Sequence, residues 1–215
     1  MADYCLLCCV VNMGVASNVL KVARKLGVQG GTIFLGRGSI HNRLLEFLQI
    51  NEERKEIVTM IVEYELASDI LKGISKHMRF DKPHHGIAFS LPVTEFTGHK
   101  NTIEKKAGSV EMKDSGYKII YVVVDRGMAE LVVESANKAG AKGGTVLNAR
   151  GAGIHEARKL FSVEVEPEKE EVFIIVKTEM KDGIVKSIKD DLRLEEPGHG
   201  IIFVMDVNEV HGLHE

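Results

Sequence analysis

The chain has 215 residues, of which 44% are hydrophobic and 27% charged, as is typical of a globular protein. Its formal net charge of -3 gives no reason to expect nucleic acid or an anionic membrane surface as a partner. It begins without a basic signal-peptide region and has no apolar run of the roughly 18 residues that a membrane span needs. Its three cysteines all lie between Cys5 and Cys9 and cannot build a disulfide framework, so we expect a cytoplasmic protein.

The sequence contains an internal repeat. The segment Gly30–Gly38 (GGTIFLGRG) recurs 113 positions later at Gly143–Gly151 (GGTVLNARG). The segment Pro83–Phe89 (PHHGIAF) recurs 114 positions later at Pro197–Phe203 (PGHGIIF). Because two separated matches share almost the same offset, the chain is a tandem duplication.

In the first copy, the β-branched run Leu6–Val11 predicts a strand, and Asn12 is a candidate helix N-cap. Apolar residues spaced by three and four from Val15 to Leu26 predict a helix, which Gly27 would end. The elements expected next are a strand through Gly30-Gly31-Thr32, a polar loop over 37–53, a strand over 57–62, a helix over 67–77 and a strand over 85–91.

The second copy repeats this order. A strand over Ile119–Val124 leads to Asp125 as a candidate N-cap, and a helix from Met128 ends before Gly140. The elements expected next are a strand through Gly143-Gly144-Thr145, a loop over 150–168, a strand over 172–176, a helix over 180–192 and a strand over 199–205. The order βαββαβ predicts an α+β fold of two ferredoxin-like modules in tandem. We expect module 1 at 1–96, a Lys/Gly/Ser/Glu-rich linker at 97–115 and module 2 at 116–215.

The loops of about fifteen residues between the second and third strands are longer than hairpin connections and are therefore candidates for function. Arg37-Gly38 and Arg150-Gly151-Ala152-Gly153 stand at their entrances. Glycines there would let backbone amides approach a phosphate or carboxylate while Arg supplies the countercharge. The alternative is that glycine only permits a left-handed turn out of the strand.

The second repeated motif is Pro-x-His-Gly, at Pro83-His84-His85-Gly86 and Pro197-Gly198-His199-Gly200. Its histidine could donate a hydrogen bond to a ligand or bind metal, and its glycine could free backbone amides. The alternative is a structural turn with a surface histidine. We favour a functional role for the Pro-x-His-Gly motif, because its presence in both copies supports a selected loop geometry.

Other patterns argue against a metal centre or an enzyme. Cys5 and Cys8 have C-x-x-C spacing, but they lie in a strand, where their side chains face opposite sides, so buried small hydrophobes are expected. His41 and His155 occupy matching loop positions, yet no zinc motif is present. No nucleotide-binding or hydrolase motif occurs either, and no acid/base pair assembles, so we expect no enzyme activity.

Taken together, the Gly-Gly-Thr strand, the long loop and the short glycine loop before an apolar last strand resemble the nitrogen regulatory P-II proteins. The similarity spans nearly the whole chain twice and is clearest in the second copy. It implies a trimer that binds ATP or ADP between subunits, often with 2-oxoglutarate, and regulates a transporter or enzyme. The ligand-binding residues that the motifs and the resemblance suggest are Thr32, Arg37, Gly38, His85, Gly86 and Lys100 in the first copy, and Thr145, Arg150, Gly151, Gly153, Gly198, His199 and Gly200 in the second.

The sequence departs from the family pattern at residues that bind the ligand or are modified in family members. The lysine expected after the last glycine loop is Ile87 or Ile201, and the loops contain no tyrosine for uridylylation. We expect a non-enzymatic sensor of a small anion, an adenine nucleotide foremost, carried by the second copy, although Lys100 favours the first. The alternative is a relative that has lost nucleotide binding and serves as a metal-binding or oligomeric interaction module. Three chains, with a ring of first copies stacked on a ring of second copies, would form the symmetric assembly, unless the two copies pack their sheets together within one chain.

Overall fold

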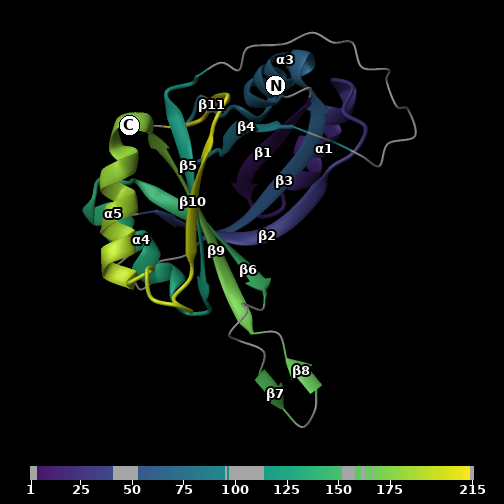
Figure 1. The fold of residues 1–215 in the computed structure, drawn as a ribbon. Coiled ribbons are helices and arrows are strands. Elements are labelled where there is room, and N and C mark those ends of the chain that lie inside the picture. The colour runs from purple at the N-terminus through teal and green to yellow at the C-terminus, as the bar shows by residue number, and fades with distance from the viewer. Residues whose placement is uncertain are drawn as a thin grey trace. The chain divides into compact units, whose positions relative to one another are not determined.

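The computed structural model describes residues 4–40, 53–94, 96, 114–151, 158–160, 163–165 and 167–213. Within these ranges the order β-α-β-β-α-β occurs twice, so the predicted α+β fold with two ferredoxin-like modules is confirmed (Figure 1). Lys100, Gly153, His41 and His155 lie outside the described residues, as do linker residues 97–113. No helix in the described ranges is long and apolar enough to cross a membrane.

Among the described residues, each copy has four principal strands and two long helices. The first contains β1 (Tyr4–Asn12), α1 (Ala16–Lys25), β2 (Thr32–Ile40), β3 (Glu53–Glu63), α3 (Tyr64–Met78) and β4 (Ile87–Val93). The second contains β5 (Tyr117–Asp125), α4 (Ala129–Lys138), β6 (Gly143–Arg150), β9 (Glu168–Lys177), the short η1 (Thr178–Met180), α5 (Lys181–Leu192) and β10 (Ile201–Asp206). Three further strands, β7 (Arg158–Leu160), β8 (Val163–Val165) and β11 (Glu209–His211), were not predicted.

The chain divides into two compact units, and each takes in a segment of the other copy. One unit comprises Met1–Phe34, Glu56–Tyr117 and Asp206–Glu215, and the other comprises Leu35–Lys55 and Lys118–Met205. Strand β2 therefore begins in the first unit and ends in the second. The modules expected at 1–96 and 116–215 follow the sequence repeat, and their bounds as folding units stay a prediction.

In the first unit, the strand order β3-β1-β4-β11 places the C-terminal strand beside β4. Strand β1 pairs antiparallel with β4, from Tyr4 opposite Val93 to Val10 opposite Ile87. Alternate residues of β1 (Cys5, Leu7, Cys9 and Val11) join one core with α1 and α3. Cys8 points to the other face and is also buried, and burial raises the pKa of its thiol to about 12. The cysteines are thus buried small hydrophobes, as predicted.

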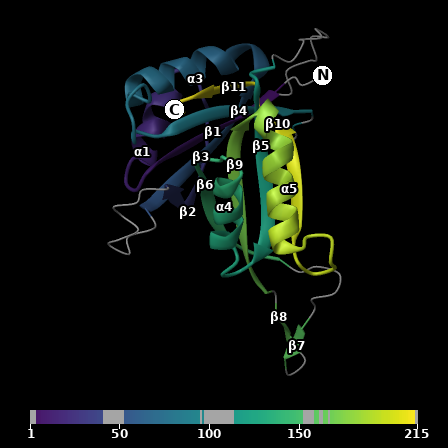
Figure 2. The ribbon, with the colours of Figure 1, turned by 90° about the vertical axis from the view of Figure 1, so that its left-hand side faces the viewer.

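The second unit has the strand order β10-β5-β9-β6, with the end of β2 beside β6. Strand β6 pairs antiparallel with both neighbours, so that Thr145 lies opposite Gly38 on β2 and Phe173 on β9. Helices α4 and α5 lie side by side on one face of these strands (Figure 2). Their apolar stripes, including Val132, Ala136, Ile184 and Ile188, form the core with β5 and β9.

Two local predictions are wrong. Asn12 and Asp125 are not N-caps, because α1 and α4 start four residues later, after Val15 and Met128, which make no side-chain cap. Carboxylates from neighbouring strands reach these helix ends instead. Arg37 and Gly38 do not stand at a loop entrance, because β2 continues to Ile40 and pairs with β6 across both residues. The predicted helix stops are correct: Gly27 and Gly140 have φ of 97° and 99°, which suits glycine after a C-cap.

Candidate functional site

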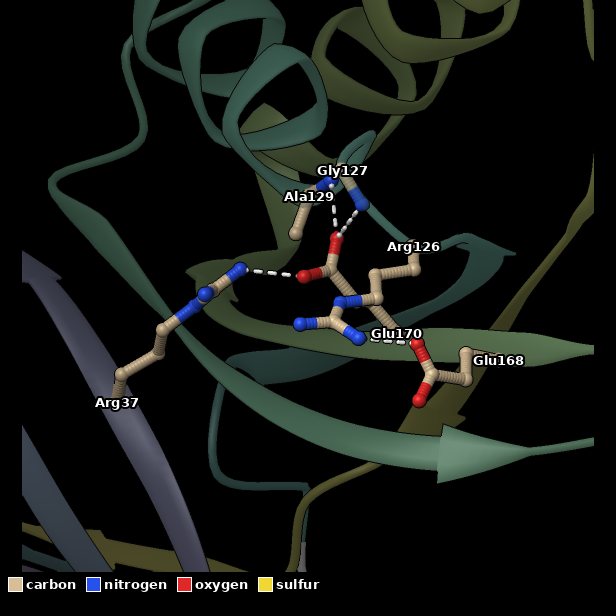
Figure 3. A network of polar contacts seen from close by, with 6 residues as sticks. All are labelled: Arg37, Arg126, Gly127, Ala129, Glu168 and Glu170. Carbon is tan, nitrogen blue, oxygen red and sulfur yellow. Dashed lines mark hydrogen bonds and ion pairs between the residues drawn. The ribbon is translucent and has the colours of Figure 1, made fainter.

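A buried carboxylate organises the second unit at the start of α4. Glu170, on β9, is only 2% exposed and accepts hydrogen bonds from the backbone amides of Gly127 and Ala129, both at 2.9 Å. Its other oxygen accepts from Nη2 of Arg37 at 2.5 Å (Figure 3). The carboxylate thus satisfies the amide of the first helix residue, Ala129, and that of Gly127 in the preceding turn, and it lies at the positive end of the helix dipole. Arg37 neutralises it, so this candidate ligand residue has a structural counterion.

The first copy repeats half of this arrangement. Glu56, at the position matching Glu170, accepts a hydrogen bond from the amide of Ala16 at 2.8 Å, at the start of α1. A strand carboxylate that caps the following helix is therefore a property of the repeat. This cap is not predictable from local sequence patterns, because its two partners, Ala16 and Glu56, are 40 residues apart.

A surface hollow of about 360 Å³ lies where β6 ends and β9 begins. Arg150 is the last residue of β6 and lies opposite Glu168, the first residue of β9, in the strand register. The turn after β5 contributes a further cation, Arg126. The hollow is lined by Arg126, Asn148, Ala149, Arg150, Glu168 and Lys169. Three cations and one carboxylate thus meet at the base of the long second-copy loop.

Two of the three cations have counterions. Arg126 forms an ion pair with Glu168. This pair holds the pKa of the Glu168 carboxyl below its ordinary value of 4.5 and raises the pKa of the Arg126 guanidinium. Nζ of Lys169 lies 2.5 Å from Oδ1 of Asp125. Arg150 is exposed and makes no ion pair with any carboxylate of the described residues. The hollow therefore carries an excess positive charge, which Arg150 supplies.

The two candidate loop glycines differ in their surroundings. Neither Gly38 nor Gly151 has positive φ, so a left-handed turn does not explain them. A Cβ at Gly38 would lie 2.9 Å from Cε of Lys55, whereas at Gly151 the nearest atom, Cγ of Lys169, would be 3.8 Å away. Packing accounts for Gly38. The described structure leaves room for a side chain at Gly151, beside Arg150.

The Pro-x-His-Gly loops have a structural role in both copies. A Cβ at Gly86 would lie 2.7 Å from the carbonyl oxygen of Val10, and one at Gly200 would lie 2.5 Å from that of Val123. The histidines cap the preceding helices: Nδ1 of His85 lies 3.3 Å from the carbonyl oxygen of Met78, and the matching His199 contact, to Leu192, is 3.1 Å. Since a carbonyl only accepts, Nδ1 is the donor. Gly198, His199 and Gly200 do not line the hollow in the described structure.

Of the remaining candidates, Thr32 is exposed, whereas Thr145 is 6% exposed, inside the sheet. Sequence reasoning missed Arg126, Asn148 and Lys169. Aligning the two copies could have pointed to Arg126, because the matching residue of the first copy is the uncharged Met13. Among the residues that the structure describes, no group of three or more His, Cys, Asp or Glu is arranged to hold a metal ion.

Comparison with known proteins shows which proteins the second copy resembles. The family model "Nitrogen regulatory protein P-II" matches residues 117–214. One similar solved structure is a GlnK–ATP complex from B. subtilis, with 21% sequence identity and a TM-score of 0.35; the match covers 45% of this chain and 93% of the GlnK chain. Another is Arabidopsis thaliana PII bound to citrate, with 27% identity and a TM-score of 0.36; the match covers 44% of this chain and 80% of the PII chain. No curated protein sequence matches. The sequence of residues 117–214 is thus similar to that of the nitrogen regulatory protein P-II family.

Proposed function

We propose that this chain is a non-enzymatic P-II-like regulator whose second copy senses a small anionic ligand, an adenine nucleotide foremost, and acts on a partner protein. The observation that carries the proposal is the exposed Arg150 in the hollow beside β6, without a carboxylate counterion among the described residues. Guanidinium groups bind phosphate and carboxylate oxygens with paired hydrogen bonds. The match of residues 117–214 to the model of a family of nitrogen regulatory proteins supports regulation rather than catalysis.

Three features support the second copy as the sensing copy. Arg150 is exposed, while the matching Arg37 is held by the buried Glu170. Gly151 leaves space for a ligand to approach the backbone, while Gly38 is packed against Lys55. Arg126 and Lys169 add positive potential in the same hollow. The contact of Thr145 with an adenine edge, and contributions from Gly153, Gly198 and Lys100, stay predictions.

The proposed assembly is a homotrimer, with first copies in one ring and second copies in another. Strand β10 ends the strand order of its unit and exposes large apolar side chains: Ile201 is 59% exposed, Phe203 40% and Val204 38%. Apolar patches of this kind are usually covered by a partner. Light scattering should give about three times the chain mass of 23.8 kDa, and a mass near a single chain would contradict the trimer.

The ligand is tested first by thermal shift with ATP, ADP, AMP and divalent metals. A rise in melting temperature with a nucleotide supports the proposal, because a ligand that binds only the folded state stabilises it. A parent protein that binds no nucleotide but responds to metal would favour the interaction-module alternative and overturn the sensor.

The binding copy is tested by calorimetry on Gly151→Val and Gly38→Val. We expect Gly151→Val to weaken nucleotide binding about tenfold or more, since it fills space beside Arg150. Circular dichroism melts accompany both variants, because a side chain at Gly38 must displace Lys55. Loss of binding in a folded Gly38→Val protein, with Gly151→Val unaffected, would assign the ligand to the first copy.

A further inference from the structure

The segment that ends the second helix carries opposite charge in the two copies. Residues 75–85, here called the basic surface, contain Lys76, Arg79 and Lys82 against one acid, Asp81, for a net charge of +2 with histidines neutral. The matching residues 189–199, called the acidic surface, have a net charge of -2. Their charged residues are Lys189, Asp190, Asp191, Arg193, Glu195 and Glu196.

The two segments share one backbone geometry. Arg79 and Arg193 both adopt the left-handed conformation after the helix, with φ of 59° and 50°. The next turn closes in the same way, by hydrogen bonds from Lys82 N to Arg79 O at 3.0 Å and from Glu196 N to Arg193 O at 2.9 Å. Two matched pairs of charged residues, Lys76 with Asp190 and Lys82 with Glu196, therefore have opposite sign on the same backbone geometry.

Matched positions on these surfaces are solvent-exposed, and neither copy needs them for its core. Lys76 matches Asp190, and Lys82 matches Glu196; all four are exposed. In the first copy, Lys76, Arg79 and Lys82 make no ion pair with carboxylates of the described residues. The basic surface thus keeps its full charge.

Local partners offset part of the charge on the acidic surface. Glu195 lies 2.7 Å from Lys189, and Asp191 lies 3.5 Å from Lys138. Asp190 has no such partner among the described residues. A net negative charge remains after these pairs are counted, because the segment has four acids and two cations.

We propose that the basic surface of one chain docks on the acidic surface of a second copy of the chain. Charge complementarity selects this partner, because each chain carries both surfaces on matching scaffolds. Such a contact is heterologous, so it leaves one unused surface at each end and can repeat from chain to chain. It uses neither the hollow at Arg150 nor strand β10, so it is independent of the proposed ligand and trimer. The attraction acts over about 10 Å at 0.1 M salt and shortens as salt rises.

Sedimentation velocity of the full chain, over a range of protein concentrations at low and high salt, tests this contact. At low salt we expect concentration-dependent assemblies larger than the high-salt species, with association roughly tenfold weaker at high salt. Two variants each make the surfaces alike in sign: Lys76→Glu with Lys82→Glu, and Asp190→Lys with Glu196→Lys. Each alone should lose the larger assemblies.

Restoration by complementary charge gives the decisive outcome. An equal mixture of the two variants should assemble again, and so should the chain carrying all four changes, in which the surfaces are exchanged. A control with Lys21→Glu and Lys142→Glu changes net charge as the first variant does, on exposed residues elsewhere, and should assemble like the parent. Parent protein without larger species at low salt, unaffected single-surface variants, or no restoration in the mixture would each overturn the proposal.

Discussion

Arg37 and Arg150 occupy matched positions in the two copies but have different surroundings. Arg37 binds the buried Glu170 at 2.5 Å, and its side chain is 26% exposed. Arg150 lies opposite Glu168 in the strand register, but that carboxylate is bound by Arg126. In the first copy the residue matching Arg126 is Met13. Arg126 thus forms the ion pair with the carboxylate that lies opposite Arg150 in the register, and Arg150 makes no ion pair among the described residues.

The same residue type at a repeated position therefore need not have the same role. The role of each arginine depends on whether a carboxylate counterion is available to it. Arg37 stabilises the start of α4, whereas Arg150 gives the hollow its excess charge. Duplication permits this division, because one copy can keep a binding residue while the other uses its equivalent for stability.

The largest expected effect concerns the two helix-capping carboxylates. Glu170→Gln should lower the free energy of unfolding by about 3 kcal/mol, because it leaves Arg37 without its buried counterion and weakens the cap of two amides. Glu56→Gln should cost about 1 kcal/mol, since among the described residues a single amide, that of Ala16, donates to Glu56. Urea unfolding of both variants measures the difference. Equal losses would show that Arg37 adds nothing to the stability of the second unit.

A smaller effect is expected from removing residues 209–215. Strand β11 pairs antiparallel with β4, from Glu209 opposite Ser90 to His211 opposite Ala88. Truncation after Asn208 should cost about 1–2 kcal/mol and speed hydrogen exchange of β4 amides. Exchange in β10, the last strand in the order of its unit, should stay unchanged. Unchanged protection of β4 would contradict a stabilising role for β11.

The smallest effect is electrostatic and concerns Glu168. The Arg126→Met variant, which copies Met13 of the first module, should raise the pKa of Glu168 back toward 4.5, because the hydrogen bond from Arg126 is the main cause of its lowering. A lowered folded-state pKa stabilises the fold above the unfolded pKa, and this contribution is lost as pH falls through the folded pKa. The variant should therefore lose a small stabilisation that the parent has above about pH 4.5. Carboxyl-carbon NMR titration gives the pKa directly, and an unchanged value would refute the assignment of the pair.

The order of elements follows from the sequence, because it depends on local periodicity. The spacing from Val15 to Leu26 and the glycines after each first helix predict α1 and α4 closely. The helix caps cannot be predicted from local periodicity. They pair Glu56 with Ala16 and Glu170 with Ala129, residues that only the folded sheet brings together. Strand β11 was missed for the same reason: three residues have no periodicity, and their partner β4 lies in the other copy.

The candidate site was predicted only in part. The repeat and its Arg-Gly motif select Arg150 and Gly151 as candidates, and both lie where β6 ends. The same motif selected Arg37, but sequence alone does not show that Glu170 binds it. Arg126 and Lys169 come from other strands or turns, so only the register of β5, β9 and β6 places them near Arg150.

The division of roles between the two arginines is tested by comparing Arg150→Gln with Arg37→Gln, by ATP titration calorimetry and urea unfolding on the same samples. Arg150→Gln should weaken ATP binding by about tenfold or more and leave stability unchanged, since one charged hydrogen-bond pair contributes about 1.4 kcal/mol or more. Arg37→Gln should lower the free energy of unfolding by about 2 kcal/mol and change ATP affinity by less than about twofold. Weakened ATP binding in Arg37→Gln, with Arg150→Gln binding like the parent, would contradict the division of roles between the two copies.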